Sequence, residues 1–514
     1  MRKLLHIDFA LAALAFLAHA AFANRYDFFR DELYFIICGR HPAFGYVDQP
    51  PVVPLISALT QAAGENLVLL RLVPALAAGA TVLVACAFAR LAGGGRFAQV
   101  AAGIPTGFAP MFLGLYATFN TTVFEPLAWT LVAYLAARAI VKGDRAALLW
   151  LGLVVGISLE VKYSIPLYLV ALIVALLLLP ERRVLRLPQT GIATAIALAI
   201  AAPSLVWQHM HGWPFAALLV AAPGKNVAVA PVPFVLDQIE VMNPLFAPIW
   251  IAGAASGFVD RRLATFRVFG LAFLLVFAEM IALHGKDYYL AAAYPPMFAL
   301  GSVVIERVVR HRALRAAYVG LGAALSVLAA PLAMPILDPP ATVRYMTLLH
   351  MTPQGQENKL AVKTMIAQGR EQLDMQEMLP QTFSDQLGWR TYEKQIASVY
   401  HTLSPEQRGR AAIITSNYGE AAALDFYGGS DGLPPALSGH NEYFLWGTHG
   451  YDGSVILFLN GNITRLRSLC REATIVATFG STYATPYERN APIMLCLGLR
   501  GPLVDLWPTF KHYE

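Results

Sequence analysis

Long apolar runs separated by short polar segments fill the first two thirds of the 514-residue chain, whereas the region after Asp338 has ordinary polarity. A membrane-spanning helix needs about 20 apolar residues. On that criterion the pattern predicts about eleven spans, near residues 5–23, 66–89, 98–116, 122–141, 146–160, 164–180, 190–206, 241–258, 265–283, 289–305 and 313–335. We therefore expect an all-α polytopic membrane domain over residues 1–337 and a soluble domain over 338–514.

Composition supports this division. Hydrophobic residues make up 57% of the chain and charged residues 14%, against about 25% charged in soluble globular proteins. One water-soluble core cannot absorb such an excess. The net charge of +5 comes from short Lys and Arg clusters between apolar runs, which argues for membrane orientation and against a nucleic acid partner.

The distribution of these clusters predicts the orientation in the membrane. The candidate inner segments hold Arg2 and Lys3, Arg90 and Arg96, Lys142 and Arg145, Arg182, Arg183 and Arg186, Arg261, Arg262 and Arg267, and Arg307, Arg310, Arg312 and Arg315. By the positive-inside rule the N-terminus is cytoplasmic, and an odd number of spans then places residues 338–514 in the periplasm. We expect a multi-pass protein of the inner (plasma) membrane. The first span also resembles a cleavable signal peptide, although we expect it to be retained.

Three segments are too long or too polar to be simple external turns: 24–65, 207–240 and 338–514. In the last of these, 411–416 and 454–459 read as short buried strands and 419–427 as a helix, which predicts a small α/β extracytoplasmic domain. Cys470 and Cys496 both lie there, and a disulfide between them is permitted outside the cytoplasm.

The first external segment carries adjacent acids, Asp31 and Glu32, beside an apolar run. Two neighbouring carboxylates at a membrane surface repel each other and are partly desolvated, which favours proton uptake by one of them. The alternative is a solvated loop or a helix start, where acids satisfy backbone N–H groups.

Glu125 stands at the outer entry to the fourth predicted span, directly before Pro126. An ionisable residue at that depth is costly unless it has a function. The alternative is an ordinary first-turn glutamate before proline.

Two lysines, Lys162 and Lys286, lie at outer ends of spans, where the positive-inside rule disfavours them. A phosphate at the outer leaflet would explain them, with hydroxyl groups from Tyr288 and Tyr289 adding hydrogen bonds. The alternative is pairing with Glu160 and Asp287, their acidic sequence neighbours, or snorkelling to the interface.

Several of these motifs together resemble the GT-C membrane glycosyltransferases. Residues 31–34 (Asp-Glu-Leu-Tyr) followed by 46–51 (Tyr-Val-Asp-Gln-Pro-Pro) are similar to their first-loop signature. The nearest group is the protein-mannosyltransferase-like family, which includes the aminoarabinose transferases that act on lipid A. Segments 124–126, 285–289 and 507–513 resemble bacterial members with a periplasmic tail, so the resemblance spans nearly the whole chain.

The resemblance implies roles for individual residues. It makes Asp31 the catalytic carboxylate, with Glu32 supporting the site or the acceptor and Glu125 as the second-loop acid. The residues that it places near substrate or donor phosphate are Lys162, Lys286, Tyr288, Tyr289, Tyr46, Asp48 and Gln49. Many relatives have lysine where this chain has Gln49.

The implied reaction is an inverting transfer of sugar from a polyprenyl-phosphate donor in the outer leaflet to a lipid, glycan or protein acceptor. Asp31 would be the general base. No cofactor is required, although the first-loop acids are also able to bind a divalent cation. Two other classes stay open: a transporter or lipid flippase, and a non-catalytic sensor or assembly scaffold. Paired halves or broken helices typical of many transporters are not evident in the sequence.

Overall fold

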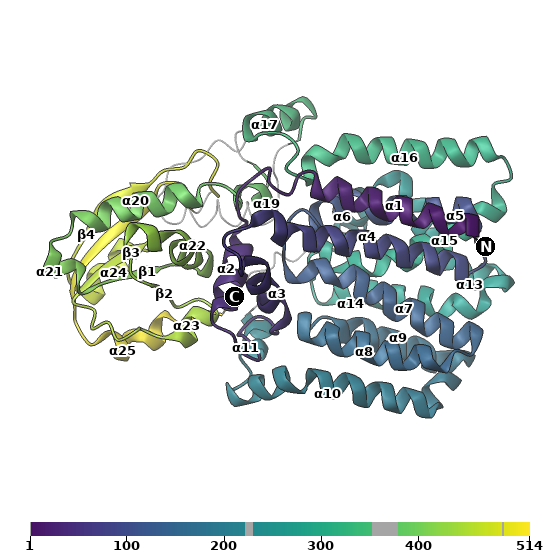
Figure 1. Cartoon of the computed structure of the whole chain (residues 1–514), viewed down its shortest axis with the longest axis horizontal. Helices are drawn as coiled ribbons and strands as arrows, with labels where there is room; N and C mark the ends of the chain where they lie inside the picture. The colour runs from purple at the N-terminus through teal and green to yellow at the C-terminus, as the bar shows by residue number, and fades with distance from the viewer. Residues whose placement is uncertain (1, 222–229, 352–378, 486–487, 514) are drawn as a thin grey trace.

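The computed structural model describes residues 2–221, 230–351, 379–485 and 488–513 (Figure 1). Parts of the predicted external segments 207–240 and 338–514 therefore lie outside the described residues. A bundle of long helices forms one part of the molecule, and a sheet with covering helices forms the other. We call residues 379–513 the tail domain.

The bundle contains a helix at each predicted span. Its members are α1 (Arg2–Ala20), α4 (Leu67–Leu91), α5 (Arg96–Phe108), α6 (Pro110–Leu115), α7 (Glu125–Lys142), α8 (Arg145–Val161), α9 (Ile165–Leu178), α10 (Pro188–Met210), α13 (Ala247–Val259), α14 (Arg267–Ala282), α15 (Tyr294–Val308) and α16 (Arg312–Ala333). Within the described residues, six helices are long and apolar enough to cross a membrane, and two sharply bent pairs would raise the number to eight.

The protein is therefore a multi-pass membrane protein, but the predicted count of eleven spans is not confirmed. Several bundle helices are short: α13 has 13 residues and α8 has 17. The predicted span 98–116 is divided, because α5 ends before Ala109 and Pro110 starts α6. Proline lacks a backbone N–H and therefore interrupts a helix at such a position.

Shorter elements connect the bundle helices. The loop over residues 24–65, predicted to be the first external loop, contains α2 (Arg30–Arg40) and α3 (Val52–Gln61); the other connecting elements are η1 (Thr121–Phe124), η2 (Pro180–Arg186), α11 (Pro214–Ala221), α12 (Pro231–Val241), η4 (Pro244–Phe246), η5 (Arg261–Phe266), η6 (Asp287–Ala293) and α17 (Pro339–Leu348). Helices α2 and α3 lie where the bundle meets the tail domain (Figure 1).

Small residues allow the bundle helices to approach closely. A Cβ atom added at Gly152 of α8 would clash with the backbone of Ala193 on α10, and one added at Gly301 of α15 would clash with the backbone of Ile249 on α13. Close backbone approach gives the packing contacts that hold helices together in lipid, where no hydrophobic force between them operates.

The tail domain is built on a five-stranded mixed sheet with strand order β2-β1-β3-β5-β4. The strands are β1 (Ala411–Thr415), β2 (Ala436–Ser438), β3 (Val455–Leu459), β4 (Cys470–Phe479) and β5 (Ala491–Leu499). Strand β1 is parallel to β2 and β3, whereas β5 is antiparallel to β3 and β4. The helices of the domain are α19 (Gln381–Ser384), α20 (Trp389–Thr402), α21 (Pro405–Arg408), α22 (Tyr418–Tyr427), η8 (Gly428–Asp431), α23 (Glu442–Trp446), α24 (Ile463–Leu469), α25 (Leu503–Leu506) and η9 (Trp507–Phe510). The two predicted strands, the predicted helix and the α/β character are confirmed.

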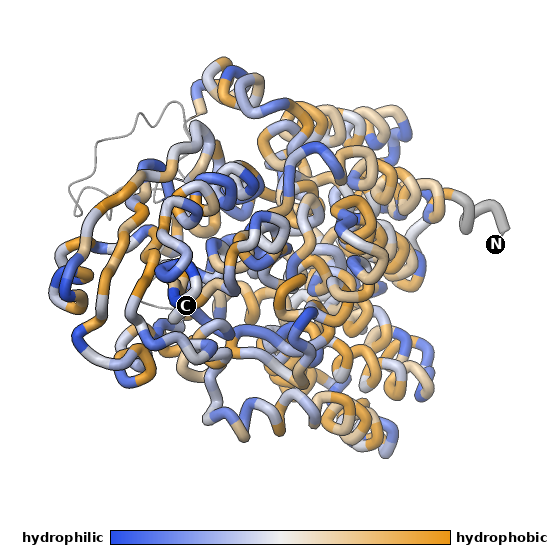
Figure 2. The backbone as a smooth tube through the Cα atoms, turned by 60° about the vertical axis from the view of Figure 1, so that its left-hand side comes forward, coloured by the Kyte–Doolittle hydropathy of each residue, from blue (hydrophilic) through white to orange (hydrophobic). Residues whose placement is uncertain are grey.

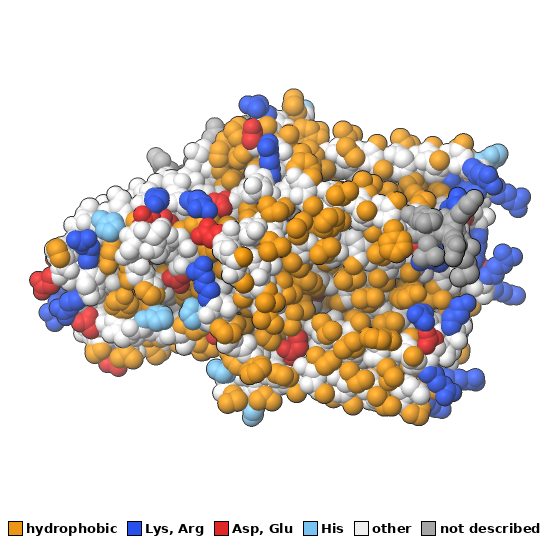
Figure 3. Space-filling view, in the orientation of Figure 1, with side chains coloured by type: hydrophobic (Ala, Val, Ile, Leu, Met, Phe, Trp, Pro, Cys, Tyr) orange, Lys and Arg blue, Asp and Glu red, His pale blue; other side chains and the backbone are white. Residues whose placement is uncertain are grey.

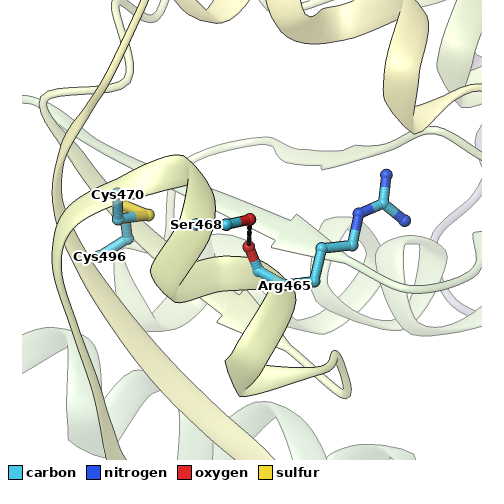
Figure 4. The surroundings of a disulfide bond; sticks show 4 residues. All are labelled: Arg465, Ser468, Cys470 and Cys496. Atoms are coloured by element: carbon cyan, nitrogen blue, oxygen red, sulfur yellow. Dashed lines mark hydrogen bonds between the residues drawn. A yellow bond between two sulfur atoms is a disulfide. The ribbon is translucent and has the colours of Figure 1, made fainter.

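A disulfide joins Cys470 to Cys496 in the tail domain (Figure 4). Cys470 follows α24 and begins β4, and Cys496 lies in the neighbouring β5. In the last turn of α24 the Ser468 hydroxyl donates to the carbonyl oxygen of Arg465 (2.7 Å). The cross-link that the sequence permits is thus present, and it ties together two paired strands.

The first external loop and the tail domain share one hydrophobic core. Leu33 and Ile37 of α2 are buried in it together with Ala421 and Phe426 of α22. The ring of Phe28, just before α2, lies 4.9 Å from that of Phe426. Since buried apolar surface is the main favourable term in folding, α2 is held against the tail domain as well as the bundle.

Hydropathy and charge differ along the molecule. The bundle is mostly apolar, and polar residues concentrate at helix ends and in the tail domain (Figure 2). On the face shown in Figure 3, Lys and Arg side chains gather at the end of the bundle that lies away from the tail domain. That end corresponds to the predicted inner side.

Candidate active site

Helix α2 brings Asp31 to the junction between the bundle and the tail domain. The helix starts after Phe29, so Asp31 lies in its first turn with a side chain that is 28% exposed. Its Oδ1 accepts a hydrogen bond from the Tyr418 hydroxyl (2.8 Å), and the Nε of Arg30 is 3.7 Å from the same oxygen. Both of these contacts are made to Oδ1 of Asp31.

Asp48, from the same external loop, interacts with Asp31. The hydroxyl of Tyr34 on α2 donates to Oδ1 of Asp48 (2.8 Å), and Asn441 of the tail domain also hydrogen-bonds to this carboxylate. Burial raises the pKa of Asp48 to about 6, and the negative charge of Asp31 adds to the rise. Two mutually repelling carboxylates therefore meet at the junction, and one of them titrates near neutral pH.

The tail domain contributes a third carboxyl group, that of Glu442. It is 4% exposed, and its Oε2 accepts a hydrogen bond from the backbone N–H of Val47 (2.8 Å). Burial raises the pKa of Glu442 to about 8, with the charge of Asp48 adding to the rise. At pH 7 this group is mostly protonated, so it joins the tail domain to the first loop without placing a full charge in the interface.

Glu32 is adjacent to Asp31 in sequence but has very different surroundings. It is completely buried and forms a two-pronged ion pair with Arg71 of α4, whose Nε and Nη2 donate to Oε1 and Oε2 at 2.9 Å each. Oε1 also accepts from the backbone N–H of Phe119, and Oε2 from that of Phe29, both at 2.7 Å. The four bonds join α2, α4 and the segment before α7, so Glu32 organises the junction rather than facing it.

Glu125, the second predicted acid, opens α7 and forms a separate cluster. The Nζ of Lys162 donates to its Oε2 (2.7 Å) and to Oγ1 of Thr122 (2.9 Å), and the Ser164 hydroxyl donates to its Oε1. Glu160 instead accepts a hydrogen bond from a serine of α10 (2.7 Å). The alternative pairing of Lys162 with Glu160 is therefore wrong, because the lysine extends toward α7.

The loop that precedes α15 reaches the Glu125 cluster through Tyr289. The ring of Tyr289 lies 5.2 Å from Nζ of Lys162, within the range of a cation–π contact. Tyr288 packs edge-on against Tyr289, with ring centroids 4.6 Å apart, and Nζ of Lys286 is 6.0 Å from the Tyr288 ring. Of the predicted phosphate-binding residues of this loop, Tyr289 contacts Lys162 directly, and Tyr288 and Lys286 follow it in a chain of contacts.

The remaining predicted residues of the first loop are buried. The hydroxyl of Tyr46 donates to the carbonyl oxygens of Cys38 (2.9 Å) and His41 (3.2 Å), which folds the loop back on α2. Gln49 is 1% exposed, and its backbone carbonyl accepts from the N–H of Tyr46 (2.9 Å). The Tyr46 side chain and the Gln49 backbone therefore shape the loop that presents Asp48.

The predicted residues thus form two groups, one around Asp31 and Asp48 and one around Glu125 and Lys162. The buried Glu32 links them, because Phe119, which it binds, begins the segment that leads to α7. Sequence reasoning missed Arg71, although an arginine inside the predicted span 66–89 is itself a signal of an intramembrane partner. It also missed the contributions of the tail domain, for which no local sequence pattern exists.

A helical bundle is thus joined to an α/β tail domain through an acidic helix of the first loop. Residues 48–207 match the sequence profile of the family described as dolichyl-phosphate-mannose-protein mannosyltransferase. Among curated proteins no significant sequence match was found.

Two solved structures have a similar fold along nearly the whole chain. ArnT from Cupriavidus metallidurans bound to undecaprenyl phosphate is 13% identical, with a TM-score of 0.60 over 95% of this chain and 97% of that chain. ArnT from the same organism in the apo state is 13% identical, with a TM-score of 0.58 over the same shares. The resemblance to the GT-C membrane glycosyltransferases is confirmed, and the chain has their fold.

Proposed function

We propose that the protein transfers a sugar from a polyprenyl-phosphate donor to a hydroxyl-bearing lipid, glycan or protein acceptor at the outer face of the inner membrane. The observation that carries this proposal is the contrast between two adjacent carboxylates. Glu32 is buried with every oxygen bonded, whereas Asp31 is partly exposed at the junction and presents Oδ2. The ArnT-like fold and the family match over residues 48–207 support the reaction class.

Two observations support an outer, periplasmic location for this junction. Lys and Arg gather at the opposite end of the bundle, as expected for a cytoplasmic side (Figure 3). The Cys470–Cys496 disulfide of the tail domain is typical of an oxidising compartment.

In the proposed mechanism, Asp31 acts as the general base. The acceptor oxygen forms a bond to the anomeric carbon of the sugar, and the proton of the acceptor hydroxyl passes to Oδ2 of Asp31. The bond from the anomeric carbon to the phosphate oxygen breaks, and the electron pair of that bond stays on the phosphate. Attack from the face opposite the leaving group inverts the anomeric configuration. A positioned base of this kind contributes about 10²- to 10⁴-fold in rate.

The leaving polyprenyl phosphate needs positive charge rather than an acid, because it departs as a stable anion. Lys162 carries three N–H donors, and two of them go to Glu125 and Thr122. The third, together with Lys286 and the hydroxyls of Tyr288 and Tyr289, is suited to bind phosphate oxygens more tightly as the bond breaks.

The test compares Asp31→Asn with Asp27→Asn in a strain that lacks the gene. Asp27 is a matched control, because its side chain is 30% exposed and also accepts a hydrogen bond from a tyrosine of α22. Mass spectrometry of envelope lipids, glycans and glycoproteins identifies the sugar that is missing in the deletion strain and restored by the parent gene.

We expect Asp27→Asn to restore that sugar and Asp31→Asn to lower the transfer rate at least 10²-fold at equal membrane abundance. Full restoration by a well-expressed Asp31→Asn protein would remove the proposed mechanism. Movement of a lipid across sealed vesicles without formation of a glycosidic bond would favour a transporter instead.

A further inference from the structure

The proposed base lies in the membrane part of the chain, but its hydrogen-bond donor comes from the tail domain. The hydroxyl of Tyr418, the first residue of α22, donates to Oδ1 of Asp31 over 2.8 Å, although 387 residues separate the two in sequence. We propose that Tyr418 is a positioning residue, which holds Oδ1 of Asp31 so that Oδ2 is presented to the acceptor. This inference rests on the proposed function.

Packing on several sides keeps the Tyr418 ring in place. Its centroid lies 4.6 Å from that of Tyr34 and 4.8 Å from that of His440, and the Arg30 guanidinium lies 5.4 Å above it. The Asn417 side chain caps α22 by accepting from the backbone N–H of the third helical residue (3.0 Å). A ring packed in this way loses little further conformational freedom when its hydroxyl orients a carboxylate, and a positioning group needs this property.

The helix backbone also approaches α2 closely at this point. Gly419 follows Tyr418, and a Cβ atom added to it would clash with the side-chain stem of Arg30. The backbone N–H of Arg30 in turn donates to the carbonyl oxygen of Asp385 in the tail domain (3.0 Å). The start of α2 is therefore held by two parts of the tail domain, the start of α22 and Asp385.

The charge state of Tyr418 suits a permanent donor. Burial raises the pKa of its hydroxyl well above the usual range; the Arg30 charge opposes this rise, and the negative charges of Asp31 and Asp48 add to it. The hydroxyl thus keeps its proton across the physiological range. In general, a hydroxyl donor binds an ionised carboxylate more strongly than a protonated one.

The same arrangement occurs at the neighbouring acid. The hydroxyl of Tyr34 donates to Asp48 (2.8 Å) and itself accepts from the backbone N–H of Glu442 (3.3 Å). Since the rings of Tyr34 and Tyr418 are in contact, the two aspartates are held by a pair of adjacent tyrosines, one from each part of the chain. The inferred active site is therefore complete only when the tail domain is docked.

The test compares Tyr418→Phe with Tyr427→Phe. Both tyrosines lie on α22 and donate to an aspartate near the start of α2, but Tyr427 binds Asp27 (3.1 Å), which has no part in the proposed reaction. Purified full-length protein is added to membranes of the deletion strain, which contain the native donor and acceptor. The initial rate of sugar transfer is then measured by mass spectrometry from pH 5 to 9.

We expect Tyr418→Phe to lower the rate roughly 10- to 100-fold, the usual effect of one hydrogen bond to a charged group, and to move the acid limb of the pH profile to higher pH. Tyr427→Phe should keep the parent rate and profile. A parent-like rate in Tyr418→Phe, or an equal loss in both variants with no movement of the acid limb, would overturn the positioning role.

Failure of the two proposals can be told apart. If Asp31→Asn is inactive while Tyr418→Phe behaves like the parent, only the positioning role fails; if Asp31→Asn is active, the proposed function fails as well. Should Tyr418→Phe melt well below Tyr427→Phe, Gly419→Ala replaces it, since this variant keeps the hydroxyl but displaces α22 from Arg30. The same movement of the acid limb is expected there, and its absence would contradict the inference.

Discussion

Replacement of Glu32 by Gln should destabilise the protein strongly, although Glu32 and Asp31 are sequence neighbours. Each Glu32 oxygen accepts two hydrogen bonds, one from Arg71 and one from a backbone N–H. An amide offers only one acceptor oxygen and turns its NH₂ group toward the other two donors. The variant therefore leaves Arg71, itself 2% exposed, as an incompletely compensated buried charge.

The magnitude follows from these contacts. Loss of one partner of a buried ion pair lowers the free energy of unfolding by about 3–5 kcal/mol. Two unsatisfied buried donors, at about 1–3 kcal/mol each, lead to a similar loss. Asp31→Asn removes no buried ion pair, since its side chain is 28% exposed, so its stability should stay within about 1 kcal/mol of the parent.

Thermal unfolding of the purified protein in detergent, followed by intrinsic fluorescence, measures this contrast. We expect Glu32→Gln to melt several degrees below both the parent and Asp31→Asn. The double variant Glu32→Gln/Arg71→Gln should lose less stability than the two single variants together, because no buried charge is then left unpaired. Equal melting temperatures for Glu32→Gln and Asp31→Asn would refute the assignment of a structural role to Glu32.

Three further outcomes are expected. Because burial raises the pKa of Glu442 from 4.5 to about 8, the stability that its protonated form provides is full below pH 4.5 and is lost as pH rises through 8. Glu442→Gln, which stays neutral, should therefore melt close to the parent at pH 5 and several degrees above it at pH 9. If the melting temperatures of parent and variant, measured by fluorescence, differ by the same amount at every pH, this prediction is wrong. Lys162→Gln should lower sugar transfer about 10- to 100-fold in the membrane assay, because it removes a proposed hydrogen-bond donor to the phosphate; Lys142→Gln, at the C-terminal end of α7, is the control that keeps the parent rate. Reduction of the Cys470–Cys496 disulfide, whose cysteines are 26 residues apart, should cost the tail domain about 3–4 kcal/mol, seen as a lower melting temperature in dithiothreitol; the Cys470→Ser/Cys496→Ser variant should melt at that lower temperature with or without reductant.

Much of the fold could be predicted from the sequence, because apolar runs between basic segments specify membrane helices locally. The number of spans could not be predicted from the sequence, because a proline such as Pro110 divides a run that is apolar throughout. In the tail domain, the fully buried strand β1 was predicted from its apolar run, whereas β4 was not. Most of β4 is exposed at the sheet edge, including the apolar residues Ile475 and Val476, so its apolar residues do not mark a buried strand.

The candidate site was predictable only in part. Asp31 and Glu125 were identified because a charge beside or within an apolar span requires an explanation. The difference between Asp31 and Glu32 could not be predicted, since it depends on Arg71, a partner from another helix. The contribution of Tyr418 depends on the docking of a segment almost 400 residues away, and no spacing rule reaches that far.

The core shared by α2 and α22 also determines the order in which the protein can be completed. Chain synthesis proceeds at about 5–20 residues per second, so about 20–80 s pass between the emergence of Asp31 and that of Tyr418. During that interval Leu33 and Ile37 lack the apolar partners that bury them in the finished molecule. Helix α2 is thus among the earliest segments to be made and among the last to reach its final packing. A chain truncated before α22 retains the helices of the bundle but not the core around Asp31.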